Sequence, residues 1–223
     1  MHLFINYLWT EPKFFFMQIF IVVFAISCHE YMHARVALWQ GDSTAADQGH
    51  LTLNPLRQMG LMSLVMLALM GIAWGQVPVN PSRMRHKYSD ALVSFAGPAA
   101  NLILGLIFCI VTALIVIISG EPDPSSVSGE ISSNAINLFY RGAILNFVLF
   151  ALNMLPIPPF DGWHIVSSFF PKLKTSESQS LSFISLVILL LVFKFINYIF
   201  IIGEWISYLM ISGVILLAQI LGV

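Results

Sequence analysis

Two histidines and a glutamate stand close together in an apolar stretch near the N-terminus, in the order His29-Glu30-Tyr31-Met32-His33. On a helix, residues four apart share one face and lie about 6 Å apart along the axis. Both imidazoles can therefore bind one Zn²⁺, and the glutamate between them can act on a zinc-bound water. This spacing often arises by chance in a water-soluble helix, whereas a charged group at the centre of a bilayer costs roughly 2.5–3.5 kcal/mol. A chance motif is therefore rarer here, and the pattern predicts a metal site.

Catalytic zinc needs a third protein ligand, and Asp161 is the strongest candidate in the rest of the chain. It follows an apolar segment that ends at Pro156, and Pro158 and Pro159 prevent the helix from continuing. An extended stretch of this kind can direct the carboxylate sideways into a helix bundle. The alternative is an ordinary turn, because aspartate is common in turns. His164 is the next candidate if Asp161 does not bind the metal.

A third cluster, Gly97-Pro98-Ala99-Ala100-Asn101, lies inside another apolar run. Glycine and proline loosen a membrane helix, and small residues let neighbouring helices approach closely. The cluster is equally typical of helix packing alone. We therefore expect Gly97, Pro98 and Asn101 to lie either on the substrate side of a site or in a packed helix interface.

Two asparagines, Asn146 and Asn153, are seven residues apart and share one face of the apolar run 135–156. Buried amides of this kind can simply join helices. Asn153 can also donate a hydrogen bond to an oxyanion, because it lies eight residues before Asp161. Both interpretations remain open at this point.

Composition indicates which elements must position these residues. Of the 223 residues, 58% are hydrophobic and 9% are charged, whereas a soluble domain carries roughly 25% charged residues. So few charges cannot cover a water-soluble surface, so the chain is predicted to be an integral membrane protein in a lipid bilayer. The net charge of −1 gives no basic field for nucleic acid. Cys28 and Cys109 both lie in apolar runs, which argues against a disulfide framework.

Apolar runs of about 20 residues can cross a bilayer. The sequence contains five such runs, at 14–39, 91–119, 135–156, 181–201 and 205–223. A shorter run, 60–74, is flanked by two β-favouring stretches, 51–55 and 77–81, which both end in Asn-Pro. The predicted fold is an all-α polytopic membrane protein with about five to six transmembrane helices. A short membrane-associated β-hairpin or re-entrant segment is expected near 50–82.

A cleaved signal peptide over residues 14–28 is the alternative interpretation of the first apolar run. Lys13 precedes this run, but so does Glu11, and no small-residue cleavage site closes it. A lipoprotein cleavage site at Cys28 is only faintly matched. Because the run continues to Trp39, a spanning helix is favoured.

In combination, these motifs resemble the site-2 protease family of intramembrane zinc metalloproteases, and within it the small bacterial branch without a PDZ domain. The matching pieces are His29-Glu30-x-x-His33, Gly97-Pro98-x-x-Asn101, Asn153-x-x-Pro156 leading to Asp161-Gly162, and the Asn-Pro segments at 53–55 and 78–81. The resemblance covers about residues 25–165. The chain departs from that branch at Arg57-Gln58-Met59, where a histidine is often found, and at the bulky Trp163.

The resemblance implies a zinc-dependent intramembrane endopeptidase that hydrolyses peptide bonds within or near transmembrane segments of membrane proteins. It implies one Zn²⁺ per chain with three ligands, a glutamate base, and an asparagine that contacts substrate or oxyanion. The residues carried over are His29, His33 and Asp161 as ligands, Glu30 as the base, and Asn153. We expect one integral-membrane peptidase domain over 1–223, with a catalytic core at about 14–165 and two additional C-terminal helices at about 181–223.

A shared metal constrains the topology. His33 lies near the C-terminal end of the first span, and Asp161 follows the C-terminal end of the third, so both ends must lie on one side. Run 60–74 therefore must not cross fully. The positive-inside rule agrees, because the loops on that side carry most of the basic residues: Arg57, Arg83, Arg85, Lys87, Lys172 and Lys174. We expect a multi-pass protein of the cell membrane, as in a bacterial inner membrane, with the active site toward the cytoplasm.

Two other functions remain as alternatives. A zinc peptidase of the prenyl-protein type would need a glutamate as third ligand, and Glu204 is the only late membrane glutamate. A catalytically silent membrane scaffold or transporter subunit would retain the fold, but the intact Glu30 argues against it. A homo-oligomer or a regulatory membrane partner remains open, as does the identity of the membrane-protein substrate.

Overall fold

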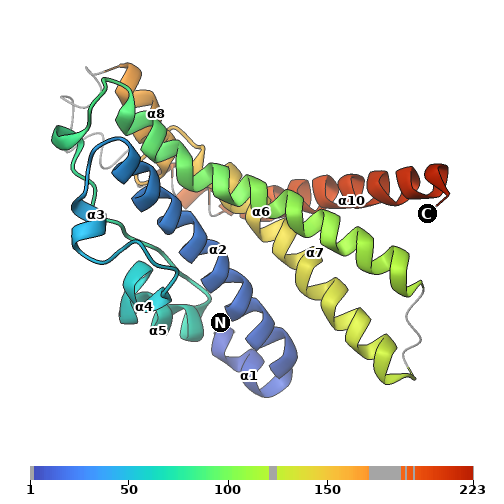
Figure 1. Ribbon diagram of the computed structural model, residues 1–223. Coiled ribbons are helices and arrows are strands. Elements are labelled where there is room, and N and C mark those ends of the chain that lie inside the picture. Colours follow the sequence, from blue (N-terminus) through green and yellow to red (C-terminus); the bar gives the residue numbers. More distant parts are fainter. Residues whose placement is uncertain (1–2, 121–124, 171–186, 189, 193, 223) are drawn as a thin grey trace.

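The computed structural model describes residues 3–120, 125–170, 187–188, 190–192 and 194–222 (Figure 1). Four helices in this part of the chain are long and apolar enough to cross a membrane: α2 (Pro12–Trp39), α6 (Ser89–Ser119), α7 (Val127–Asn153) and α10 (Ile196–Leu221). The shorter helices are η1 (Phe4–Asn6), α1 (Tyr7–Thr10), α3 (Thr44–Asp47), α4 (Pro55–Gln58), α5 (Gly60–Met70), η2 (Pro81–Arg83) and α8 (Asp161–Phe169). The predicted all-α membrane architecture is confirmed.

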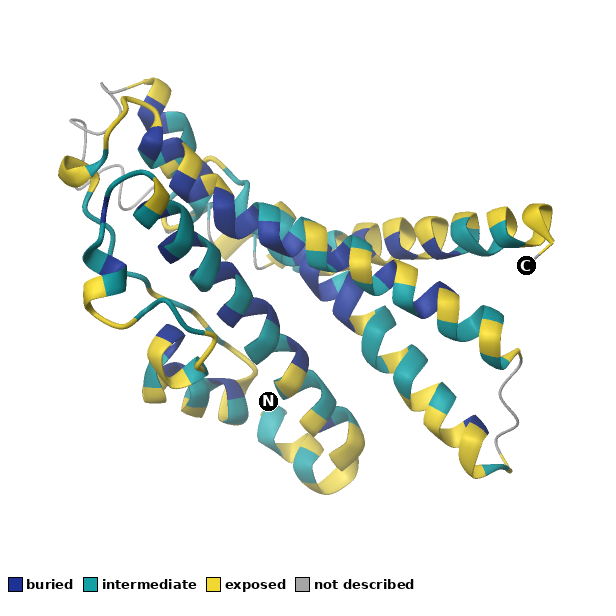
Figure 2. Cartoon of the chain, in the orientation of Figure 1, coloured by how far each residue is buried: buried dark blue, intermediate teal, exposed yellow. Residues whose placement is uncertain are grey.

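Helix α6 is central and packs against α2, α7, α8 and α10. Its buried positions are mostly small residues, which let the neighbouring helices approach closely: Ala91, Ala96, Gly97, Ala100, Gly105, Cys109 and Ala113. Buried residues accordingly line the faces where α2, α6 and α7 meet, whereas the outer faces are exposed (Figure 2). The buried core therefore lies mainly where α2, α6 and α7 meet, and α5 and α10 add to it.

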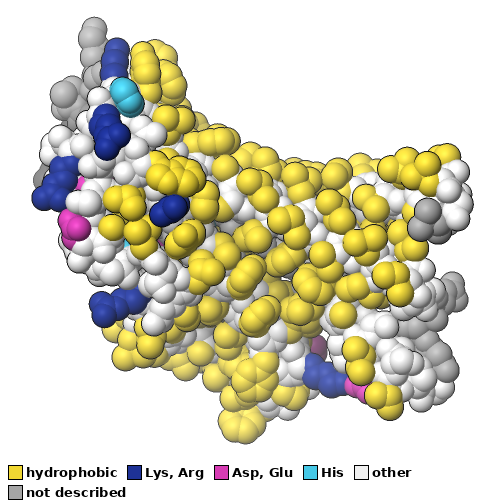
Figure 3. Space-filling view, viewed as in Figure 1, with side chains coloured by type: hydrophobic (Ala, Val, Ile, Leu, Met, Phe, Trp, Pro, Cys, Tyr) yellow, Lys and Arg dark blue, Asp and Glu magenta, His cyan; other side chains and the backbone are white. Residues whose placement is uncertain are grey.

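The outer surface suits a bilayer. Hydrophobic side chains cover most of the face drawn in Figure 3, and several Lys and Arg side chains gather at the end where α8 lies. The segment just before α6 contributes exposed basic residues at this end, namely Arg83, Arg85 and Lys87. Helix α10 presents large apolar side chains outward, including Ile202, Trp205 and Leu209. Such a surface is stable in lipid and would aggregate in water.

Helix α5 is too short to span a bilayer, because its 11 residues reach only about 16 Å. It ends at Gly71, whose φ of 75° is left-handed, and the chain returns as an extended segment over 72–80. The return is tied to the outgoing chain where Gln76 N–H donates to the Gln58 carbonyl over 3.0 Å. Because α3 and α4 both pack against α2, the excursion stays beside that helix.

The predicted β-hairpin near 50–82 is not confirmed, because no strand forms among the described residues. Each Asn-Pro pair begins a helix. Asn54 caps α4 by accepting from Leu56 N–H over 3.0 Å, and Asn80 caps η2 by accepting from Ser82 N–H over 3.1 Å. Asparagine favours the cap and proline the first helical position, so the same dipeptide signals a helix start as readily as a turn. The extended segment 72–80 has no strand partner within the part of the chain that the structure describes.

The predicted break between spans 181–201 and 205–223 is wrong, because α10 runs without interruption from Ile196 to Leu221. Gly203 lies inside the helix and packs against Val148 and Ile144 of α7. Residues 171–186 lie outside the described residues, and with them most of the first half of span 181–201. Four candidate spans are therefore established, and the predicted count of five to six is not confirmed.

Candidate metal centre

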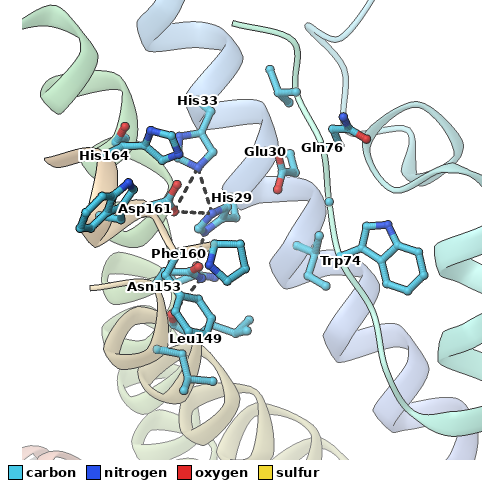
Figure 4. A pocket seen from close by; sticks show the side chains of 18 of the residues that line it. His29, Glu30, His33, Trp74, Gln76, Leu149, Asn153, Phe160, Asp161 and His164 are labelled. Atoms are coloured by element: carbon cyan, nitrogen blue, oxygen red, sulfur yellow. Dashed lines mark hydrogen bonds and ion pairs between the residues drawn. The ribbon is translucent and has the colours of Figure 1, made fainter. Parts of the chain in front are cut away.

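The structure brings His29, His33 and Asp161 together at one point (Figure 4). The two histidine Nε2 atoms are 2.9 Å apart, and Oδ2 of Asp161 lies 3.1 Å from Nε2 of His29 and 3.4 Å from Nε2 of His33. Zinc binds such atoms at about 2.1 Å, so tetrahedral ligand atoms lie about 3.4 Å apart. Within the described part of the chain, this is the one cluster of three or more ligand residues with converging atoms. The donor set fits zinc.

Each histidine is held from behind by an oxygen. Nδ1 of His33 lies 2.7 Å from the Val93 carbonyl, and Nδ1 of His29 lies 2.6 Å from Oδ1 of Asn101. A carbonyl can only accept, so His33 carries its proton on Nδ1 and turns the lone pair of Nε2 toward the cluster. Metal-binding histidines typically have such a partner, which fixes the ring orientation.

Burial alone would raise the pKa of Asp161, but the imidazoles of His29 and His33 beside its carboxylate lower it well below its usual range. The carboxylate therefore stays ionised, which is the form that binds a cation. Its Oδ2 is buried, lies beside the two Nε2 atoms, and has no hydrogen-bond partner among the described residues. A metal ion would satisfy this atom.

Asp161 reaches the cluster because α7 ends at Asn153, three residues before Pro156. The chain then turns, and Asp161 is the first residue of α8 rather than part of an extended stretch as predicted. Gly162 permits this tight start, since a Cβ there would lie 2.5 Å from the backbone oxygens of Met154 and Leu155. The prolines therefore stop α7, and the glycine lets α8 pack against its end.

Two glycines leave room for the polar side chains of the site. A Cβ on Gly97 would collide with the Nε2 atoms of both His29 and His33, and a Cβ on Gly75 would collide with the Glu30 side chain. The closeness of Gly97 to a site was among the sequence expectations. Gly75 was missed, because nothing in its sequence neighbourhood distinguishes it from an ordinary loop glycine.

Glu30 lies between the metal cluster and the extended segment 72–80 (Figure 4). Its residue is 8% exposed, so the carboxylate is shielded but still faces a cavity. The cavity measures about 1090 Å³, at the upper end of the volumes typical of ligand pockets. Its walls include α2, α8 and the extended segment.

The other predicted site residues lie at different places around this cavity. Asn153 lines the wall near Asp161, and its Nδ2 donates to the Leu149 carbonyl of its own helix over 3.0 Å. Asn101 lies behind His29, facing its Nδ1, and is completely buried. Pro98 is buried in α6 and does not border the cavity. His164 borders the cavity but is not part of the metal cluster.

The geometry does not favour the prenyl-type alternative. Glu204 lies exposed on α10 and does not belong to the metal cluster formed by the described residues. The third converging ligand atom comes from Asp161 instead.

Comparison with known proteins agrees with this geometry. The model of peptidase family M50 matches residues 17–193. A curated relative described as "Putative zinc metalloprotease YwhC" of Bacillus subtilis is 32% identical over 173 residues, which cover 75% of this chain and 77% of that protein. Proteins described as "Putative zinc metalloprotease Rip2" match from Mycolicibacterium smegmatis (33% identical, 66% of this chain and 57% of that protein) and Mycobacterium tuberculosis (28%, 78% and 65%). No solved structure matches the chain.

The family match covers the motif from His29 to His33, the helices α6 and α7, and Asp161. Zinc chemistry, membrane helices and a peptide-sized cavity are all features that such a protease needs. The chain therefore belongs to peptidase family M50 and is a zinc-dependent metalloendopeptidase of the membrane.

Proposed function

We propose that His29, His33 and Asp161 hold the zinc ion and that Glu30 is the general base of peptide hydrolysis. The observation that carries this assignment is the convergence of three ligand atoms within 3.4 Å of one another at the wall of the cavity that Glu30 also borders. Zinc, when bound, supplies Lewis acidity and makes water nucleophilic near neutral pH. Glu30 takes the proton of the attacking water and returns it to the leaving amine.

Asn153 is proposed as the side chain that stabilises the oxyanion of the scissile peptide. It is half-buried and lines the same wall of the cavity as Asp161 (Figure 4). The Leu149 carbonyl accepts one of the two amide protons. The second proton remains for a substrate oxygen.

We further propose that substrate pairs with the extended segment 72–80. Its outer edge is already occupied: Ser63 Oγ binds both backbone groups of Trp74, Gln58 accepts from Gln76 N–H, and Asp42 accepts from Asn80 N–H. In an extended chain the residues between these points turn their backbone groups to the opposite edge.

The residues that face this way are Gly75, Val77 and Val79, and all three border the cavity. Their backbone groups have no hydrogen-bond partner within the described part of the chain. A helical substrate hides its carbonyls in its own hydrogen bonds, so it must unwind before cleavage. The free edge then receives the unwound stretch by strand addition, beside Glu30.

The protein is proposed to lie in a cell membrane with its site toward the cytoplasm and α5 as a re-entrant segment. The exposed basic residues at the α8 end support this orientation. Single cysteines at Thr52 and Ser82, in a variant without Cys28 and Cys109, should both react with an impermeant maleimide from the cytoplasmic side only. Reaction from opposite sides would contradict the topology.

The functional test uses purified protein in detergent with a single-span membrane protein as substrate. Chelation should abolish cleavage, and addition of about one Zn²⁺ per chain should restore it. Cleavage that survives complete removal of zinc would overturn the proposed mechanism.

A further inference from the structure

A chain of buried hydrogen bonds begins at His29 and runs away from the cavity. Nδ1 of His29 lies 2.6 Å from Oδ1 of Asn101. Nδ2 of Asn101 donates to Oδ1 of Asn146 over 2.9 Å, and Nδ2 of Asn146 donates to the Gly142 carbonyl over 2.8 Å. The chain therefore links α2, α6 and α7 through two asparagines that are both completely buried.

This chain has only one consistent direction. The Gly142 carbonyl can only accept, so Asn146 must present its NH₂ group there and its oxygen to Asn101. Asn101 must then donate its NH₂ group to Asn146 and present its oxygen to His29. The imidazole must therefore carry a proton on Nδ1, which leaves the lone pair of Nε2 for the cavity side.

Burial prevents this direction from reversing. Neither asparagine reaches solvent, so no water can replace a partner if one amide turns over. A reversed amide would bring two donors or two acceptors together, and buried polar groups without partners are strongly disfavoured. The neighbouring His33 needs no such relay, because the Val93 carbonyl fixes it directly.

We propose that Asn101 and Asn146 are positioning residues that hold His29 in the Nδ1-protonated form and so prepare its Nε2 for zinc. This inference rests on the zinc-binding role proposed above for His29. It replaces the expectation that Asn101 serves the substrate or packing alone. It also predicts that α7 affects the metal site through Asn146, which does not touch the metal.

The test compares two substitutions of Asn101 in full-length protein purified in detergent. Asn101→Leu keeps the size of the side chain but removes the acceptor. Asn101→Asp keeps an oxygen facing His29 and, because burial favours the neutral acid, an O–H that can donate to Asn146. Thr112→Val is the matched control, because Thr112 is buried on the same helix and donates to the Phe108 carbonyl over 2.8 Å. The dissociation constant of Zn²⁺ is measured by competition with a chelating dye, and folding by gel filtration and a thermal melt.

Asn101→Leu should weaken zinc binding by about 10–100-fold, and Asn101→Asp should stay within about threefold of the unaltered protein. Thr112→Val should leave zinc affinity unchanged. Unchanged affinity in folded Asn101→Leu would overturn the proposal. Equal losses in both Asn101 variants would also overturn it, because the acceptor would then not be what matters.

A second measurement needs no substitution of Asn101. In zinc-loaded protein with ¹⁵N-labelled histidine, the resonances of His29 should show a protonated Nδ1 that exchanges slowly with water. Asn146→Leu should shift the His29 resonances and leave those of His33 in place. An unprotonated Nδ1 on His29, or equal shifts for both rings, would overturn the relay. A separate variant distinguishes failure of the relay from failure of the proposed zinc-binding role. If His29 does not bind zinc, His29→Ala retains the metal.

Discussion

The cavity has two walls that are built in different ways. One wall is helical, and its side chains converge on a point: three atoms that can bind a metal ion lie within 3.4 Å of one another, and each histidine has a partner behind it. The other wall is the extended segment 72–80, which belongs to no helix or sheet. It is held in place only at intervals, by hydrogen bonds along its outer edge.

This difference separates chemistry from substrate binding. On the helical wall the side chains carry the function, so single substitutions should change zinc content or turnover. On the extended wall the backbone binds the substrate, so substitutions that displace the segment 72–80 should raise KM.

The largest effect is expected for Asp161→Ala. Two histidines alone bind zinc too weakly, so the variant should lose its metal and all detectable cleavage. Zinc per chain is measured by elemental analysis after gel filtration. His164→Ala, three residues later on the same helix, is the control and should retain zinc. The opposite pattern would make His164 the third ligand.

Gly97→Ala should come next, because a Cβ there would collide with both ligand imidazoles. Relief of that collision should displace the rings, lower zinc affinity and cost about 1–3 kcal/mol of stability. Gly213→Ala on α10 is the matched control, since a Cβ there meets nothing within 4 Å. A Gly97→Ala variant with normal zinc affinity would show that the helical wall is softer than proposed.

Asn153→Ala should lower turnover by roughly 10²–10³ if its amide stabilises the oxyanion. Zinc content and the folded fraction should stay level, because the side chain is not a ligand. Cleavage rate per zinc-loaded chain is the measurement, with a thermal melt beside it. An unchanged rate per zinc, with stability lower by roughly 0.6–2 kcal/mol, would leave Asn153 with a packing role alone.

The extended wall should respond differently. Asp42 is completely buried, and its Oδ2 accepts from Asn80 N–H over 2.6 Å. Asp42→Asn leaves one oxygen for two sets of donors. Its NH₂ group must face either Asn80 N–H or the donors of Thr44, so one contact is lost and the segment 72–80 should loosen. We expect KM to rise several-fold, which is less than the full loss of a hydrogen bond to a charged group, about 1.5–3 kcal/mol, would produce. Turnover per zinc at saturation should change little, and a fall in turnover with KM unchanged would contradict the separation of the walls.

The same carboxylate gives a pH dependence. Burial would raise the pKa of Asp42, but hydrogen bonds from Thr44 and Asn80 lower it below its usual value. Its contribution to stability is therefore complete above the unfolded-state pKa of about 4. It is lost as the pH falls through the lowered folded-state pKa. The stability difference between the unaltered protein and Asp42→Asn should shrink in that acidic range, and a difference that is constant from pH 7 down to pH 2 would contradict this.

Much of the helical wall could be predicted from the sequence. The i, i+4 spacing of His29 and His33 is local, so it survives without any knowledge of the fold. Asp161 is distant in the chain, and the proline-rich stretch before it gave only a weak signal of its own. The resemblance to known motifs made it the preferred ligand, and the structure then placed its carboxylate beside both imidazoles.

The extended wall could not be predicted in the same way. Whether Asn-Pro starts a helix or closes a strand depends on the partners available, and here Asn54 and Asn80 are both helix caps. The ties at Asp42, Gln58 and Ser63 join residues up to 38 positions apart, and no local pattern marks them. The direction of the asparagine relay likewise emerges only when three helices are packed together.

Glu30 is proposed to accept the proton of the attacking water without itself binding the zinc ion. Glu30→Gln tests this most directly. A membrane protein that this variant traps in native membranes is first isolated, and it then serves as substrate for both the variant and the unaltered protein. Zinc content and melting temperature should match those of the unaltered protein, while cleavage falls below detection, because an amide cannot accept the proton of water. Cleavage at the unaltered rate would contradict the proposed role of Glu30, and loss of zinc would show that Glu30 belongs to the metal site itself.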